Sequence, residues 1–108
     1  MALKIKKKKK RQREQQRQNR LRRAFLLEPD LRNQLKKRGL WLHSHFDSDG
    51  ESVTWRICSE NGDRGAWLVV RPCELTWSCP KTKERGTYQS PGHVFTLVRE
   101  RFRHWRAQ

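Results

Sequence analysis

Positive charge is concentrated at one end of this 108-residue chain, which leaves only the remainder free to build an apolar core. Residues 1–38 carry sixteen of the twenty-six Lys and Arg side chains against three carboxylates, so they hold +13 of the net charge of +15. Such an excess of one sign repels itself and is best neutralised by a polyanion. We therefore expect a basic arm, residues 1–38, followed by a small folded body, residues 39–108, and a nucleic-acid partner.

The basic arm is predicted to be mostly helical. Residues 1–10 are of low complexity and are expected to be disordered until a partner binds. Residues 11–38 are rich in Arg, Gln, Leu and Lys, which favour helix, and contain no Gly. Because Pro29 suits the first turn of a helix, we expect one helix to about Leu27 and a second from Pro29 to Arg38, ended by Gly39.

The body begins where the hydrophobic period changes to two, which is typical of strands. Strands are predicted at residues 40–46, 52–58, 66–71 and 74–79. Asp49-Gly50 and Asn61-Gly62 read as two-residue hairpin turns that need positive φ, and such turns fix the pairing of the strands. They place Phe46 opposite Val53, Leu42 opposite Ile57, Ile57 opposite Ala66, Trp55 opposite Leu68 and Val53 opposite Val70.

This register gives the sheet one apolar face, with Ser44 as its exception. Its members are Leu42, Phe46, Val53, Trp55, Ile57, Ala66, Leu68 and Val70, extended by Leu75, Trp77 and Cys79. A C-terminal helix is expected after Ser90, with Pro91 in its first turn. Its apolar stripe is Val94, Leu97, Val98, Phe102 and Trp105. The predicted fold class is α+β: a basic N-terminal helical arm, a four-stranded antiparallel meander and a C-terminal helix packed on one sheet face.

The arm presents arginines at helical spacing. They are Arg13, Arg17 and Arg20, followed on the same face by roughly Arg23 or Ala24, and they are interspersed with Gln12, Gln15, Gln16, Gln18 and Asn19. Over about residues 6–23 this composition resembles the arginine-rich motifs of small viral and phage RNA-binding proteins, and also the basic extensions of ribosomal proteins. The resemblance implies a helix that enters a widened RNA groove. The alternative is a solvated charged helix or a nuclear localisation signal.

The sheet face away from the C-terminal helix is predicted to be aromatic and basic. It would carry Trp41, His43, His45, Thr54, Arg56, Cys58, Trp67, Val69 and Arg71. An open face of this composition suits base stacking combined with phosphate contact. The alternative is that the arm, through residues 21–25 and 31–35, covers this face, which would make its Trp residues core.

Metal binding and catalysis are only weakly indicated. The possible ligands, His43, His45, Cys58, Cys73 and Cys79, lack the paired spacing of zinc sites. Carboxylates beside these histidines would suit a metal-dependent nuclease, but Asp47, Asp49 and Glu51 also belong to an ordinary turn sequence. The sequence therefore predicts no metal, cofactor or catalytic residue.

The function expected is that of a non-enzymatic RNA-binding protein, a component or accessory of a ribonucleoprotein whose arm binds structured RNA. The candidate contact residues are Lys6, Lys7, Lys8, Lys9, Lys10, Arg11, Arg13, Arg17, Arg20, Arg22, Arg23, Lys36, Lys37, Arg38, Trp41, His43, Arg56, Trp67, Arg71, Arg99, Arg103 and Arg106. The alternative is a DNA-binding regulator or architectural factor of a phage or mobile element, and a further one is the small metal-dependent nuclease.

The expected location is intracellular. No apolar run approaches the roughly 20 residues of a membrane span, and no secretory signal is recognisable. Three Cys without a disulfide framework fit a reducing compartment. We expect a cytoplasmic protein, or a nuclear or nucleolar one in a eukaryotic or viral setting.

Overall fold

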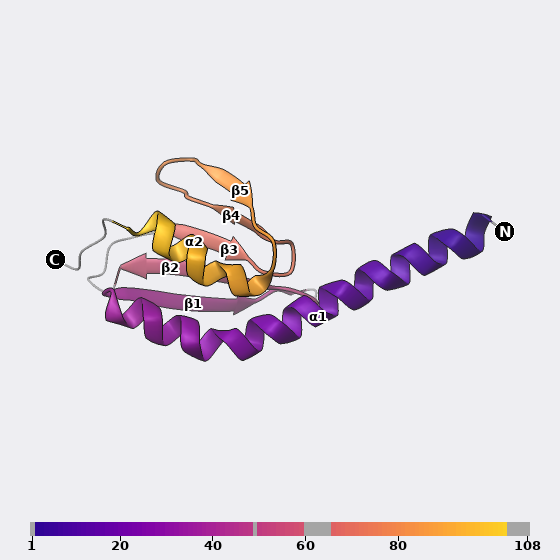
Figure 1. Ribbon diagram of the computed structural model, residues 1–108, viewed down its shortest axis with the longest axis horizontal. Coiled ribbons are helices and arrows are strands. Elements are labelled where there is room, and N and C mark those ends of the chain that lie inside the picture. Colours follow the sequence, from indigo (N-terminus) through magenta and orange to yellow (C-terminus); the bar gives the residue numbers. More distant parts are fainter. Residues whose placement is uncertain (1, 49, 60–65, 104–108) are drawn as a thin grey trace.

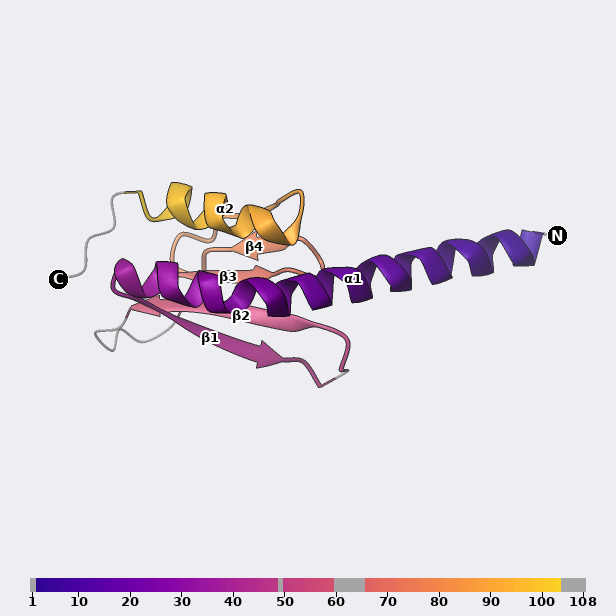
Figure 2. The ribbon, with the colours of Figure 1, turned by 60° about the horizontal axis from the view of Figure 1, so that its bottom comes forward.

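Two helices lie on one face of a single antiparallel sheet (Figure 1, Figure 2). The computed structural model describes residues 2–48, 50–59 and 66–103, with side chains described from residue 12. The elements are α1 (Ala2–Lys37), β1 (Leu40–Phe46), β2 (Val53–Ser59), β3 (Leu68–Arg71), β4 (Thr76–Ser78), β5 (Arg85–Thr87), the 3-10 turn η1 (Pro91–His93) and α2 (Val94–Arg101). The α+β class and the order helix, meander, helix agree with the prediction.

The sheet has five strands in the order β1-β2-β3-β4-β5, not the four predicted. The fifth strand pairs Thr87 with Thr76 and Arg85 with Ser78. Its sequence, Arg-Gly-Thr, has no apolar alternation to reveal a strand. The predicted strands at residues 66–71 and 74–79 are also shorter in the structure, and Leu75 lies in the β3–β4 turn with a φ of 57°.

The first predicted hairpin register is confirmed and the second is wrong. Phe46 pairs with Val53 and Leu42 with Ile57, as expected. In the second hairpin Trp55 pairs with Val70 and Ile57 with Leu68, two residues away from the prediction. Asn61-Gly62 and Asp49 lie outside the described residues. Because side chains alternate with a period of two, a shift of two residues leaves the predicted faces of the sheet unchanged.

Helix α1 is continuous, so the prediction of two helices separated at Pro29 is wrong. The helix bows away from the sheet (Figure 1), and Pro29 is on its exposed side. A proline costs one helical hydrogen bond, and there water can satisfy the freed carbonyl. Gly39 follows with a φ of 73°, which confirms the predicted stop. The helix includes residues 2–10, whose disorder in the absence of a partner stays a prediction.

The C-terminal half of α1 belongs to the core. Ala24, Leu31 and Leu35 are fully buried and cluster with Leu42, Trp55 and Ile57 on the apolar face of the sheet. Val94, Leu97, Val98 and Phe102 close the same core from the α2 side. The alternative in which the arm covers the opposite face is therefore wrong. Trp105 lies outside the described residues.

Strand β1 is one edge of the sheet, and α1 caps part of that edge. In the ladder that contains the Asp47–Ser52 hydrogen bond, alternation turns the backbone carbonyl of Leu42 away from β2. Arg32 of α1 donates a hydrogen bond of 2.8 Å from Nη1 to that oxygen. The same guanidinium lies 3.4 Å from Glu28, one helical turn earlier.

Candidate nucleic-acid interface

The sheet face opposite to the helices, here called the open face, has basic and hydroxyl side chains. The alternation of buried and outward residues assigns to it Trp41, His43, His45, Thr54, Arg56, Cys58, Val69, Arg71, Thr76, Ser78, Arg85 and Thr87. These outward strand positions include three arginines, two histidines and no carboxylate. The charged side chains at these strand positions are therefore all basic or histidine.

One row of this face runs across all five strands. His43 pairs with Arg56, Arg56 with Val69, Val69 with Ser78, and Ser78 with Arg85. Strands lie about 4.8 Å apart, so Arg56 and Arg85 are about 14 Å apart across the row. From the sequence, Arg85 groups with the basic C-terminal segment and not with this face, because β5 is not predicted. The available signal was the threonine at residue 87, which pairs across the sheet with Thr76.

A shallow hollow of about 530 Å³ lies over β3, β4 and β5. Its lining includes the guanidinium-bearing Arg71 and Arg85 and the hydroxyl-bearing Thr76, Ser78 and Thr87. Guanidinium and hydroxyl groups donate the hydrogen bonds that phosphate oxygens accept. The hollow therefore has the chemistry of a site for a phosphate group.

Trp41 and Trp67, both predicted to offer their rings to bases, have different surroundings. Trp41 is 47% exposed, and its ring centroid lies 6.2 Å from that of His43. Trp67 is half-buried and packs against the core, and Lys81 Nζ lies 3.8 Å from its ring centroid. Of the two, Trp41 is the more exposed and the better placed to stack on a base.

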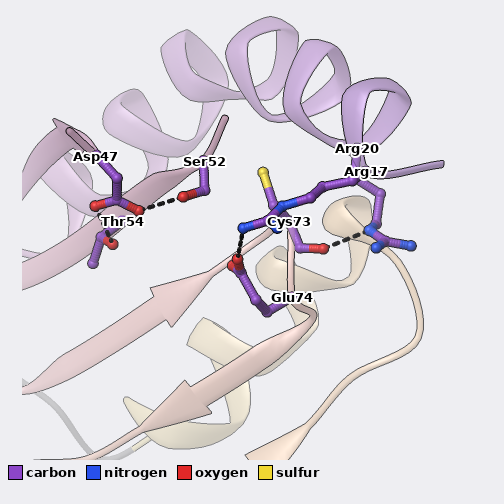
Figure 3. A network of polar contacts seen from close by, with 7 residues as sticks. All are labelled: Arg17, Arg20, Asp47, Ser52, Thr54, Cys73 and Glu74. Atoms are coloured by element: carbon purple, nitrogen blue, oxygen red, sulfur yellow. Dashed lines mark hydrogen bonds and ion pairs between the residues drawn. The ribbon is translucent and has the colours of Figure 1, made fainter. Parts of the chain in front are cut away.

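Two carboxylates of the body, Glu74 and Glu84, form ion pairs with the helices. Glu74 forms an ion pair of 2.7 Å with Arg17 of α1 (Figure 3), and Glu84 one of 2.7 Å with Arg101 of α2. The hydrogen bond and charge of Arg101 lower the pKa of the Glu84 carboxyl. The Arg101 guanidinium also lies 4.0 Å from the ring centroid of Trp77. Among the described carboxylates, that of Asp47 lies at the hairpin end of the open face, where it accepts a hydrogen bond from Thr54.

Two arginines predicted to read RNA instead bind the body. Arg17 pairs with Glu74, and Arg20 Nε donates a hydrogen bond of 2.6 Å to the carbonyl oxygen of Cys73 (Figure 3). Both side chains are half-buried. Arg17 and Arg20 lie seven and four residues before Ala24, so helical periodicity puts them on the stripe that continues into the core. Arg17 and Arg20 are thus turned toward the β3–β4 turn, whereas Arg13 and Arg23 of the same predicted face are exposed.

The exposed cations of α1 and α2 form a second basic surface, here called the helical side. They are Arg13, Arg22, Arg23, Arg32, Lys36 and Lys37 of α1, Arg99 of α2 and Arg103 just after it, and the exposed carboxylates of the same helices are Glu14, Asp30 and Glu100. Arg38 is half-buried in the turn that follows α1. The backbone of residues 6–11 is part of α1. Outside the described set are Arg106 and the side chains of Lys6, Lys7, Lys8, Lys9, Lys10 and Arg11.

The described residues offer little to a metal-dependent reaction. Within them, no group of three or more His, Cys, Asp and Glu side chains gathers closely enough to hold a metal ion. Asp47 accepts hydrogen bonds from Ser52, at 2.5 Å, and from Thr54, at 3.4 Å (Figure 3). It is therefore part of the hairpin's own structure. Cys58, Cys73 and Cys79 are free thiols, and burial raises the pKa of Cys58 and of Cys73.

The helices of the described part of the chain do not combine the length and the apolarity needed to cross a membrane. Comparisons with protein-family models, with curated proteins and with solved structures gave no match to this chain. The two basic surfaces are therefore the main indication of what the protein does.

Proposed function

We propose that this chain is a non-enzymatic RNA-binding protein, a component or accessory of a ribonucleoprotein. The observation that carries the proposal is the open face, where three Arg, two His and an exposed Trp occupy outward strand positions that hold no carboxylate. A sheet face that served only as solvent-exposed surface would be expected to carry charged side chains of both signs. This one has the composition of a surface for a polyanion with bases.

Unpaired RNA fits the open face better than a duplex does. Bases splayed from a single strand stack on aromatic rings, and Trp41 supplies an exposed one. The hydroxyls of Thr76, Ser78 and Thr87 beside Arg71 and Arg85 suit a phosphate and a ribose 2′-hydroxyl. Helix α1 and its basic N-terminal run add electrostatic affinity for structured RNA.

Binding of the full chain to single-stranded RNA, an RNA hairpin, single-stranded DNA and duplex DNA tests the proposal. Fluorescence anisotropy between about 50 and 200 mM salt gives the affinities and salt slopes. We expect RNA to be preferred, and Arg56→Gln with Arg71→Gln to reduce the slope for single-stranded RNA by about 0.7 per lost phosphate contact. Arg99→Gln, on the other side of the sheet, is the charge control.

Trp41→Ala separates stacking from packing. We expect it to weaken single-stranded RNA binding by about 1–3 kcal/mol while the thermal unfolding transition stays intact, because Trp41 is about half exposed and is not part of the buried core. Trp67→Ala, in contrast, should lower the melting temperature. Equal affinity for duplex DNA and RNA at every salt concentration would overturn the proposal in favour of a DNA-binding factor.

A further inference from the structure

Figure 2 shows α1 and α2 on one side of the sheet layer, so the helical side and the open face lie on opposite sides of it. The helical side carries exposed cations such as Arg22 and Arg99, whereas Arg56, Arg71 and Arg85 are on the open face. Between the two surfaces lies an apolar core that includes Leu31 and Trp55. A nucleic-acid segment on one surface therefore does not reach the cations of the other through the molecule.

Salt screening separates the two surfaces as well. A helix with its side chains is about 10–12 Å in diameter. Because the helices and the sheet both lie between the two surfaces, the surfaces are separated by more than this distance. The Debye length at 0.1 M salt is about 10 Å. A phosphate bound on one surface thus leaves the charges of the other largely uncompensated. Each surface keeps its own attraction for a polyanion.

The described cation at the β1 edge is already engaged, because Arg32 bonds to the Leu42 carbonyl and lies 3.4 Å from Glu28. At the β1 edge, Phe25 of α1 stacks on Phe46 at a centroid distance of 5.8 Å, and both rings are partly exposed. Beside β5, the carboxylate of Glu84 is 53% exposed and already pairs with Arg101. An apolar stack and an ion pair are poor paths for a phosphate backbone. A single strand is therefore not guided from one surface to the other.

We infer that one copy of this chain holds two separate RNA segments at once, a paired segment on its helical side and an unpaired segment on its open face. The inference rests on the proposed RNA binding and adds an activity to it, the bridging of two RNAs. On α1, Gln15, Asn19 and Arg22 are exposed on one outer stripe, where amides and a guanidinium can contact a helical groove. The open face offers Trp41 and the phosphate-binding chemistry of its hollow to an unpaired strand.

A capture experiment with the full chain tests the bridging. A biotinylated RNA hairpin is immobilised, protein is added, and retention of a fluorescent oligouridine that cannot pair with the hairpin is measured. The open-face variant is Arg56→Gln with Arg71→Gln, and the helical-side variant is Arg22→Gln with Arg99→Gln. Each variant removes two exposed cations from one surface, so each is the charge-matched control for the other.

We expect the wild-type chain to retain the oligouridine on the hairpin, with one protein copy per pair of RNAs by native mass spectrometry. The open-face variant should lose retention at least about tenfold while it still binds the hairpin, and the helical-side variant should show the reverse binary defect. Competition of hairpin and oligouridine for the free chain would overturn the inference, because it shows one shared surface. Two protein copies per complex would overturn it as well. If neither RNA binds alone, the proposed function itself fails.

Discussion

The side chain of Arg20 donates a hydrogen bond of 2.6 Å from Nε to the backbone carbonyl of Cys73, which lies 53 residues further along the chain. Together with the Arg17–Glu74 ion pair, this contact attaches α1 to the β3–β4 turn. The part of α1 that is N-terminal to these contacts projects beyond the sheet (Figure 1). The exposed cations of the helical side therefore have a fixed position relative to the open face.

Arg20→Met tests this attachment, because methionine keeps the apolar stem and removes the guanidinium. Hydrogen bonds to charged groups contribute about 1.5–3 kcal/mol, and we expect a loss of stability of that order in urea unfolding. Arg22→Met, two residues on and exposed, is the matched control and should change stability by no more than about 0.5 kcal/mol. Equal stability of the two variants would show that the Arg20 contact does not fix α1.

The membership of α1 in the core predicts different effects for two of its leucines. Leu31 is fully buried, whereas Leu26 is 78% exposed. We expect Leu31→Ala to destabilise the fold by about 2–5 kcal/mol, from lost burial and the cavity left behind. Leu26→Ala should be close to neutral. Thermal unfolding followed by circular dichroism compares the two, and similar melting temperatures would contradict the packing of α1 on the sheet.

Gly86 is predicted to be intolerant of a side chain. A Cβ at this position would lie 2.8 Å from Trp77 Cζ2 and 2.9 Å from Trp77 Nε1. Because the indole also packs against the core and against Arg101, we expect Gly86→Ala to cost about 1–3 kcal/mol. Gly92→Ala is the control, since its nearest neighbouring atom is 3.9 Å away. The unfolding midpoint in urea should fall for the first variant and not for the second.

Cys58 provides a chemical probe of the open face. It pairs with Trp41 across β1 and β2 and is half-buried, whereas Cys73 and Cys79 are buried. Burial raises the pKa of the Cys58 thiol above its ordinary value of 9.0, so its alkylation should be slow at neutral pH and accelerate up to and beyond pH 9. We expect saturating single-stranded RNA to slow this alkylation, measured by mass spectrometry. An unchanged rate would place the RNA elsewhere.

Much of the sheet could be predicted because its signals are local. The alternation in β1 and β2 and the Asp49-Gly50 sequence define the first register without reference to the rest of the chain. The second register was derived from Asn61-Gly62 alone, and the observed pairs, Ile57 with Leu68 and Trp55 with Val70, are not centred on that dipeptide. The unbroken helix at Pro29 depends on tertiary packing of Leu31 and Leu35, which outweighs one lost hydrogen bond.

The candidate interface was predictable only where it depended on those strands. Trp41, Arg56 and Arg71 are on the open face as expected, because their parity follows from the first two hairpins. The roles of Arg17 and Arg20 could not be read from helical spacing, which gives the faces of a helix and not the partner of each face. Their partners, Glu74 and Cys73, are in a turn whose position depends on the whole meander.

The bond from Arg32 to the Leu42 carbonyl also bears on how the sheet avoids growing. An edge strand with free backbone groups is a template for the strand of another molecule. Here an added strand would first have to displace a guanidinium from β1, and the opposite edge, β5, is only three residues long. Lateral polymerisation is thus disfavoured at both edges. A protein that gathers on a polyanion, where its local concentration is high, can in this way stay a set of separate molecules.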